Sequence, residues 1–256
     1  MRRVAWVAGW VGWLVLVGVG YGLPLQGPAP LCPAGKSEAW LGTDPLGRRI
    51  EVRLLRGWGL SVAVGLASAG TALCLGVLIG LWSGTRPGMV DALLTMLLQA
   101  IWVVPALLWA AVLAFLFGRG FLALVGAIGL STWTETARLV RIEVRRLWRE
   151  PFMEAAKALG LSHARLLWRH LLPNLGPLLR VQFLQVFATA VIIEAGLGFV
   201  GLGLPPPQVS LGSLLLEAMG WLTIPQGQWQ GILAGLCLSG TVFAVYSLLT
   251  DERHAL

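Results

Sequence analysis

The stretch from Trp58 to Trp82, WGLSVAVGLASAGTALCLGVLIGLW, contains no charged residue. A helix needs roughly 20 apolar residues to cross the hydrocarbon core of a bilayer, so this stretch is long enough. Five further stretches have a similar character: about 4–23, 89–117, 121–140, 177–200 and 230–250. None of the six alternates apolar with polar residues, as a membrane β-strand does. Because lipid forces each segment to satisfy its own backbone hydrogen bonds, the sequence predicts an all-α integral membrane protein with six transmembrane helices.

The composition supports the same class. Of the 256 residues, 57% are hydrophobic and 12% are charged, which is about half the charged fraction of a soluble domain. The net charge of +7 and the pI near 10.3 would also suit a nucleic-acid-binding protein. In a membrane protein, however, such an excess usually marks the cytoplasmic loops. We therefore expect membrane lipids, and no nucleic acid, as partners.

The distribution of basic residues predicts the orientation. Arg2 and Arg3 precede the first span, a dense basic run extends from Arg138 to Arg180, and segment 201–229 has no Lys or Arg. The positive-inside rule then puts both termini in the cytoplasm. One cluster on the predicted outer side is an exception that needs its own explanation: Arg48, Arg49, Arg53 and Arg56.

The first apolar stretch is predicted to be a retained helix, because it is about 20 residues long and lacks the small-residue cleavage site of a signal peptide. The Pro- and Gly-rich segment that follows predicts an extended outer loop. The chain thus divides into a first transmembrane helix with its outer loop, 1–57, and a five-helix permeation core, 58–256. Within the core, a cytoplasmic loop spans about 150–173.

Four arginines lie at helical spacing after the fourth predicted span: Arg138, Arg141, Arg145 and Arg149. This spacing puts them on one face of a helix, which we expect to continue that span out of the membrane. Such a stripe can bind lipid headgroups at the cytoplasmic boundary or contact a partner protein. The sequence leaves both interpretations open.

A short amphipathic helix is predicted next. Pro151 suits a first helical position, and Glu150 and Glu154 suit the positive end of a helix. Its apolar residues recur at i, i+3, i+4 and i+7 and make one narrow face: Phe152, Ala155, Ala156 and Leu159. Because this face is small and has no Trp anchor, insertion into a groove of a partner protein is favoured over lying on the membrane.

The end of the short helix is also marked. Gly160 is placed to end it in a left-handed turn. Ser162 can cap the following helix, and Pro173 is predicted to terminate that helix.

These residues resemble the "EAA" loop of permease subunits of bacterial ABC importers: Glu154-Ala155-Ala156, Gly160 after three residues, and Leu172-Pro173 after eleven more. Two further segments resemble signatures of the second (C-type) permease subunit of the dipeptide/oligopeptide/nickel importer family. The first is LGTDPLGR at 41–48, with Thr43, Asp44, Leu46, Gly47 and Arg48. The second is EAGLGFVGLG at 194–203, with Pro206-Pro207 after it. The three segments occur in the family's order over about residues 40–250.

The resemblance implies a type I ABC importer permease in the bacterial inner membrane. Its partners would be a second permease subunit in a heterodimer, two ABC ATPase subunits, and a periplasmic or lipid-anchored solute-binding protein. ATP and Mg²⁺ would bind to the ATPase chains, so no cofactor is expected in this chain, which would be a transport subunit and not an enzyme. The cargo would be a dipeptide or oligopeptide or, alternatively, nickel or glutathione.

The resemblance also implies a mechanism. The coupling loop would contact the ATPase through Phe152, Glu154, Ala155, Ala156, Leu159, Gly160, Leu172 and Pro173. ATP binding would close the ATPase dimer and open the path outward, and hydrolysis would reset it, which is alternating access through a two-state element.

Two positions depart from the family's pattern. Arg49 stands where most members have an acidic residue, which leaves the outer basic cluster less balanced. Ser210-Leu211-Gly212 replaces a common Ser-Trp-Gly, which bears on how a binding protein would dock.

The acids in or near the predicted spans include Glu194, Asp91 and Glu217. Glu194 is inside the fifth span, and intramembrane acids are costly and often functional. It can line a gate, bind substrate amines, or make a structural hydrogen bond, and these alternatives stay open. Asp91 and Glu217 lie near span ends and are expected to be interfacial.

Other patterns carry less weight. Gly35-Lys36-Ser37 lacks the earlier glycine of a phosphate loop, which is Pro30 here. The glycines from Gly196 to Gly201 follow no strand, so close helix packing explains them better than dinucleotide binding. An intramembrane protease would need a His inside a span, and none lies there. A simple channel would need no coupling helix.

Overall fold

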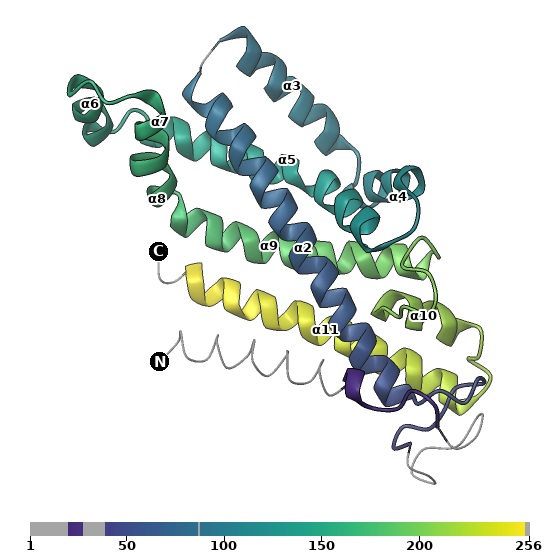
Figure 1. Cartoon of the computed structure of the whole chain (residues 1–256). Coiled ribbons are helices and arrows are strands. Elements are labelled where there is room, and N and C mark those ends of the chain that lie inside the picture. The colour runs from purple at the N-terminus through teal and green to yellow at the C-terminus, as the bar shows by residue number, and fades with distance from the viewer. Residues whose placement is uncertain (1–19, 28–38, 87, 254–256) are drawn as a thin grey trace. The chain divides into compact units, whose positions relative to one another are not determined.

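The computed structural model describes residues 20–27, 39–86 and 88–253, and this part of the chain is helical apart from two isolated β-bridges (Figure 1). The long helices are α2 (Ile50–Thr85), α3 (Met89–Val103), α4 (Ala106–Phe117), α5 (Phe121–Leu147), α9 (Gly176–Phe199) and α11 (Pro225–Arg253). The short ones are α6 (Pro151–Ala158), α7 (His163–Leu166), the π-helix η1 (Leu167–Leu171), α8 (Leu172–Asn174) and α10 (Leu211–Met219). The predicted all-α class is confirmed. The first predicted span, 4–23, falls almost entirely outside the described residues.

Three described helices are long and apolar enough to cross a membrane: Ile50–Thr85, Gly176–Phe199 and the Pro225–Thr250 part of α11. They contain three of the predicted spans. α5 covers the stretch 121–140, but it runs on into charged residues and is not among the three. The six-span count and the orientation with both termini inside remain predictions.

The predicted span 89–117 is not one continuous helix, because the chain breaks there. α3 and α4 meet at an angle of 91°, and Val104 between them is extended. Pro105 is the cause, since it has no N–H to donate and its ring disfavours helical geometry at the preceding residue. The indole of Trp109 donates a hydrogen bond to the Ile101 carbonyl (3.1 Å), which also accepts from the Val104 N–H (3.3 Å).

The chain forms two compact units. One comprises the described residues up to Val64 with Gly118–Leu124 and Val191–Phe243, and the other comprises Gly65–Phe117, Val125–Ala190 and the residues from Ala244 onward. The division at residues 57 and 58 stays a prediction.

In the first unit, α10 packs closely against the start of α2 and the end of α9. Ser210 caps α10 in a reciprocal hydrogen-bonded box with Ser213, which satisfies free N–H groups at the helix start. A Cβ on Gly198 would lie 3.1 Å from the backbone of Gly212, so glycine is what permits this approach. Close packing, predicted for this glycine-rich segment, is confirmed.

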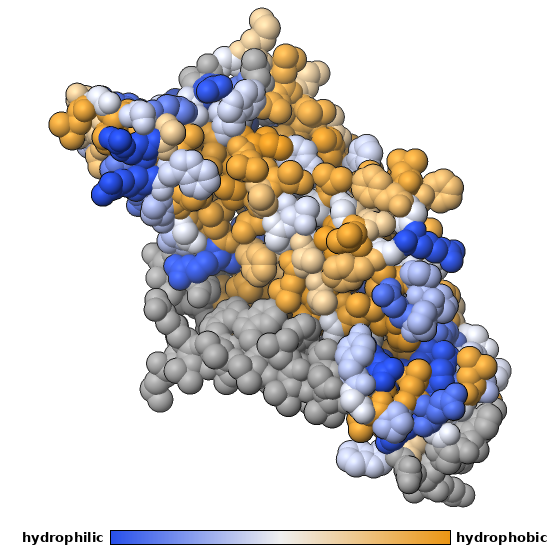
Figure 2. Space-filling model, in the orientation of Figure 1, coloured by the Kyte–Doolittle hydropathy of each residue, from blue (hydrophilic) through white to orange (hydrophobic). Residues whose placement is uncertain are grey.

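In the second unit, α2 and α5 touch along a stripe of glycines spaced by four residues. Gly76, Gly80 and Gly84 face Thr136, Val140 and Val144 in turn. At Gly80 an added Cβ would lie 2.8 Å from the Val140 Cβ, closer than real side chains come. Such small-residue stripes let membrane helices approach and gain van der Waals contact without help from the hydrophobic effect. Figure 2 shows the apolar side chains that cover these helices.

Candidate functional site

The predicted coupling segment forms its own small cluster of helices in the second unit (Figure 1). α6 begins at Pro151, in the first helical position as predicted, with Glu150 extended before it. One face of α6 holds Met153 and Ala156, both buried against Leu171 and other residues of a common apolar cluster. Ala156, predicted on the outward apolar face, therefore lies on the inner face instead.

The opposite face of α6 is apolar and exposed. Phe152 is 42% and Leu159 is 81% exposed, and Ala155 between them is exposed too. We call these three residues the outer strip. Glu154, beside the strip, is also exposed. Apolar side chains at i, i+3 and i+7 that nothing in the described chain covers are the form in which a helix is presented to a groove.

α6 is fixed to the end of α5. The Lys157 ammonium donates to the Trp148 carbonyl (2.9 Å) and lies 4.1 Å from the centre of the Trp148 ring. His163 meets the same ring edge-on, with the ring centres 5.4 Å apart. These contacts, with the buried Met153 and Ala156, hold the outer strip in a defined direction.

Gly160 ends α6 with a positive φ of 73°, as predicted. The Gly160 N–H donates to the Lys157 carbonyl (2.9 Å) and the Leu161 N–H to the Ala156 carbonyl (3.4 Å), which is the hydrogen-bond pair of a Schellman motif. No atom lies within 4 Å of where a Gly160 Cβ would be. The backbone conformation, and not space, is therefore what requires glycine here.

The prediction that Pro173 terminates its helix is wrong. The chain stays helical through Pro173 to Asn174, because the preceding turn widens into the π-helix η1. There the Leu172 N–H donates to the Leu167 carbonyl, five residues back. The wider turn makes room for a proline that has no N–H to donate. Ser162 occupies the predicted capping position, but its side chain makes no capping hydrogen bond.

The arginine stripe on α5 has a partner that neither sequence interpretation included. Asp91, in the first turn of α3, accepts two hydrogen bonds from Arg141 (2.7 and 3.1 Å) and one from Arg145. Arg138 lies over the Trp102 ring at 4.8 Å. Three of the four arginines are thus used within the chain, and Arg149 remains exposed.

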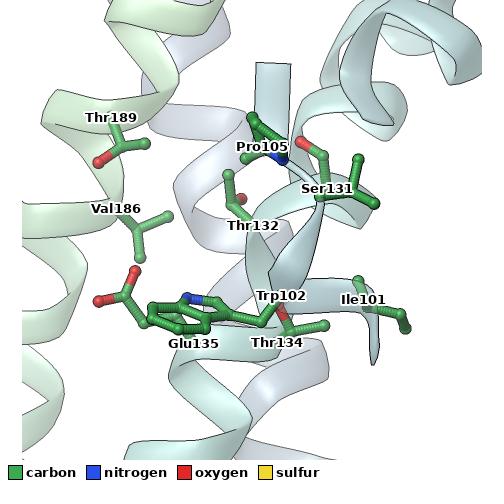
Figure 3. Close-up of a pocket in the computed structure, with 11 residues that line it drawn as sticks. Ile101, Trp102, Pro105, Ser131, Thr132, Thr134, Glu135, Val186 and Thr189 are labelled. Atoms are coloured by element: carbon green, nitrogen blue, oxygen red, sulfur yellow. The ribbon is translucent and has the colours of Figure 1, made fainter. Parts of the chain in front are cut away.

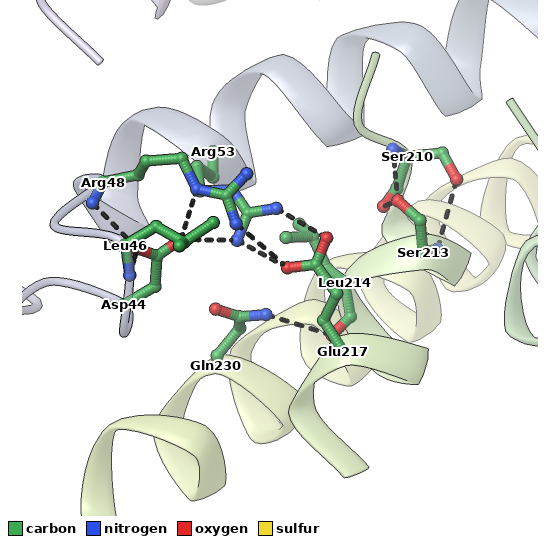
Figure 4. Close-up of polar contacts among 9 residues, drawn as sticks. All are labelled: Asp44, Leu46, Arg48, Arg53, Ser210, Ser213, Leu214, Glu217 and Gln230. Atoms are coloured by element: carbon green, nitrogen blue, oxygen red, sulfur yellow. Dashed lines mark hydrogen bonds and ion pairs between the residues drawn. The ribbon is translucent and has the colours of Figure 1, made fainter. Parts of the chain in front are cut away.

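The outer-loop motif folds around a fully buried carboxylate (Figure 4). One Asp44 oxygen accepts from the backbone N–H groups of Leu46 (2.9 Å) and Arg48 (2.8 Å). The other accepts from the side chains of Arg48 (2.6 Å) and Arg53 (3.0 Å). Gly47, with φ 74°, closes the turn by donating to the Asp44 carbonyl (2.9 Å). Thr43 is buried beside it, whereas Leu46 is 69% exposed.

Arg53 extends this network to α10. It is 1% exposed, and it donates to Glu217 (2.8 Å) as well as to Asp44. Glu217, expected only to be interfacial, is therefore an ion-pair partner. Sequence reasoning did not predict this ion pair, nor the pairing of Asp91 with Arg141 and Arg145, because the partners are far apart along the chain.

The other two arginines of the outer cluster are also engaged. Arg49 pairs with Glu51 (2.9 Å), and Arg56 donates to the carbonyls of Gly20 and Leu23 (both 3.0 Å). If this segment lies outside as predicted, its basic cluster has a structural reason. The arginines pair with buried Asp44 and with the partly exposed Glu51 and Glu217, and Arg56 satisfies backbone carbonyls.

Glu194 on α9 is fully buried, and neither carboxylate oxygen has a hydrogen-bond partner among the described residues. The Ser61 hydroxyl near it accepts from the Leu211 N–H (3.0 Å), and the Ser210 hydroxyl accepts from the Ser213 N–H (3.3 Å). Because these two hydroxyls lie beside the Glu194 carboxylate, a structural hydrogen bond, a gate role and binding of substrate amines all stay predictions.

No group of three His, Cys, Asp or Glu side chains that could hold a metal ion is found within the described ranges. The described cysteines, Cys74 and Cys237, are free.

The helical spans, the broken helix pair and the protruding α6–α8 cluster define a multi-pass membrane protein of the permease type. Residues 76–251 match the family of binding-protein-dependent transport system inner membrane components. The chain belongs to this family.

Several relatives carry more specific names. The chain is 36% identical over 187 residues to an oligopeptide transport system permease protein of Bacillus subtilis, covering 73% of this chain and 61% of that protein. It is 32% identical over 229 residues to a di/tripeptide transport system permease protein of Pseudomonas aeruginosa, covering 90% and 75%. A putative peptide permease protein of Brucella suis is 32% identical over 216 residues, covering 84% and 72%.

The fold also has solved counterparts. A chain of the MetNI methionine ABC transporter in an inward-facing conformation superposes with a TM-score of 0.61 at 19% identity, covering 78% of this chain and 95% of that one. The type I permease fold predicted from the sequence is confirmed by this match.

Proposed function

We propose that this chain is a permease subunit of an ATP-driven importer that carries peptides across the bacterial inner membrane. Three kinds of observation support the cargo and the class: the family match, relatives named as peptide permeases at 32–36% identity, and the type I fold. The relatives' names favour peptides over the alternatives of nickel and glutathione.

One observation carries the ATP-driven part of the proposal: the exposed outer strip on α6, held in place by a buried opposite face. An exposed apolar strip loses its contact with water when it enters a groove of another protein, and burying Phe152 and Leu159 would contribute a few kcal/mol, at about 1.5–3 kcal/mol for each large side chain. Since nothing in the described chain covers the strip, a separate ATPase subunit is the partner that suits it. Glu154 would add a charged contact at the rim.

The remaining partners follow from the class. A second permease subunit in a heterodimer would complete the path, two ABC ATPase subunits would bind beneath, and a solute-binding protein would deliver the peptide to the outer side. ATP and Mg²⁺ would bind to the ATPase chains. In this scheme both termini and the α6–α8 cluster are cytoplasmic.

The experiment is ATP-dependent peptide uptake by the assembled complex in liposomes, with Glu154→Lys and Gly160→Val as variants. Both are expected to reduce uptake at least tenfold and to weaken co-purification of the ATPase. In Gly160→Val a β-branched side chain meets a positive φ, where it is strongly disfavoured.

Two matched variants separate coupling from general damage. Gly160→Asn keeps a residue that tolerates the left-handed region, so it should retain most of the uptake. Glu143→Lys, a charge reversal at a partly exposed position of α5, outside α6, should leave uptake unchanged. Normal ATPase binding and uptake in both Glu154→Lys and Gly160→Val would overturn the assignment of the coupling segment.

A further inference from the structure

A cavity of about 200 Å³ lies within the second unit, at the break between α3 and α4 (Figure 3). Trp102 and Pro105 line it from the break, Glu135 lines it from α5, and Thr189 lines it from α9. At roughly 30 Å³ for each water molecule, the volume corresponds to about six or seven waters. The cavity therefore has room for one end of a small solute and not for a whole peptide.

Three of the four hydroxyl groups that line the cavity, those of Ser131, Thr132 and Thr189, can accept hydrogen bonds but have already donated their protons. Ser131 and Thr132 both donate to the Ile128 carbonyl (2.8 and 2.9 Å), and Thr189 donates to the Gln185 carbonyl (3.0 Å). A hydroxyl has a single proton and two lone pairs. Each of these side chains thus has only acceptor capacity left for a ligand in the cavity.

Glu135 adds a negative charge to these acceptors. It is half-buried, and Gln185 donates a hydrogen bond to one of its oxygens (3.2 Å). No arginine or lysine forms an ion pair with it among the residues that the structure describes. Arg138, one helical turn further along α5, holds its guanidinium over the Trp102 ring at 4.8 Å instead. The carboxylate therefore lacks a counter-ion inside a predicted span, where an unpaired charge is costly.

The ligand that matches these features has several N–H donors and a positive charge. An ammonium group has three donors and no acceptor, so it matches a carboxylate surrounded by hydroxyl oxygens that accept. Broken helices in membrane proteins recur where solutes bind, because the unwound backbone is tolerated only next to a cavity.

We infer that this cavity is a subsite for the free α-ammonium group of a transported peptide, with Glu135 as the counter-ion. The inference rests on the proposed function and adds to it the substrate feature that is recognised. The carboxylate, together with the hydroxyls whose protons are already donated to backbone carbonyls, would select peptides with a free amino end over peptides whose amino end is blocked.

The test measures equilibrium binding of labelled trialanine and of N-acetyl-trialanine to the complex of this chain, its permease partner and the ATPases in nanodiscs. The solute-binding protein is left out, so that its own selectivity does not enter. The wild-type complex should prefer the free amine about tenfold or more, as is typical when a charge-assisted hydrogen bond is lost. Glu135→Gln should remove most of this preference, and Glu135→Asp should keep part of it.

Controls separate the possible failures. Glu143→Gln makes the same chemical change at a partly exposed position of α5 outside the cavity, and it should leave the preference intact. Co-purification of the ATPase establishes that Glu135→Gln assembles. If wild-type complexes take up no peptide in liposomes, the proposed function fails. If they do, and Glu135→Gln either keeps the preference or weakens both ligands equally, the carboxylate does not select the free amino end and the subsite is refuted.

Discussion

Neutralising Asp91 should destabilise the protein far more than neutralising Glu143, a partly exposed acid on α5. Asp91→Asn removes the one negative charge that two arginines share. The side chains of Asp91 and Arg141 are 8% and 11% exposed, whereas Arg145 is 38% exposed. The change leaves the Arg141 guanidinium buried without an anion, although Arg145 can turn toward solvent.

The expected loss in free energy of unfolding follows from the burial of Asp91 and Arg141. Removing one partner of a buried ion pair costs roughly 3–5 kcal/mol. Because Arg145 can be rehydrated, we expect the lower end, about 3 kcal/mol. For a chain of this size each kcal/mol shifts the midpoint of thermal unfolding by about 2–4 °C, so the midpoint should fall by about 6–12 °C.

The matched variant is Glu143→Gln on α5. Glu143 pairs with Arg146, whose side chain is 59% exposed, and such exposed pairs contribute about 0–1 kcal/mol. Its midpoint should fall by at most about 4 °C.

The assay is thermal unfolding of the purified protein in detergent, followed by fluorescence. Equal midpoints for Asp91→Asn and the wild type would refute the reasoning, and so would an equal loss in the two variants. Either result would mean that the Asp91 site contributes no more than a solvated surface pair.

Two further predictions concern packing and the outer network. Gly80→Ala should lower stability by about 1–3 kcal/mol because its Cβ would crowd Val140. Gly70→Ala on the same helix, where the space is open, should be neutral or raise stability by up to about 1 kcal/mol. Thermal unfolding measures both variants, and equal effects would contradict the close α2–α5 contact. Arg53→Met should cost about 3 kcal/mol or more and expose the outer loop to protease, since buried Asp44 loses one of its two cationic partners. Arg53→Lys keeps the charge but loses the planar fork, so its stability should lie between those of the wild type and Arg53→Met. Protease resistance equal to wild type in Arg53→Met would contradict the role of Arg53 as a bridge between Asp44 and Glu217.

The sequence by itself determined the class, the positions of the long helices and the local signals of α6. Uninterrupted apolar length leaves a helix as the one way to satisfy the backbone in lipid. Pro151 and Gly160 act through their own backbone preferences, which need no distant partner. For the same reason Pro105 contained the signal for the break at Val104, although the uniform apolar character of 89–117 concealed it.

The tertiary structure decided which side chains meet. Asp91 with Arg141, and Arg53 with Glu217, join residues separated by 50 and 164 positions, and no local pattern encodes such a pairing. Only the packing showed that Ala156 points inward while Phe152 points outward, because helical periodicity groups residues on a face without saying what covers it. Glu135 carried the same signal as Glu194, an acid within a predicted span, but its importance depends on a cavity that three separate segments of the chain line. Long-range contacts are fixed by the fit of whole surfaces, and that information is distributed over the entire chain.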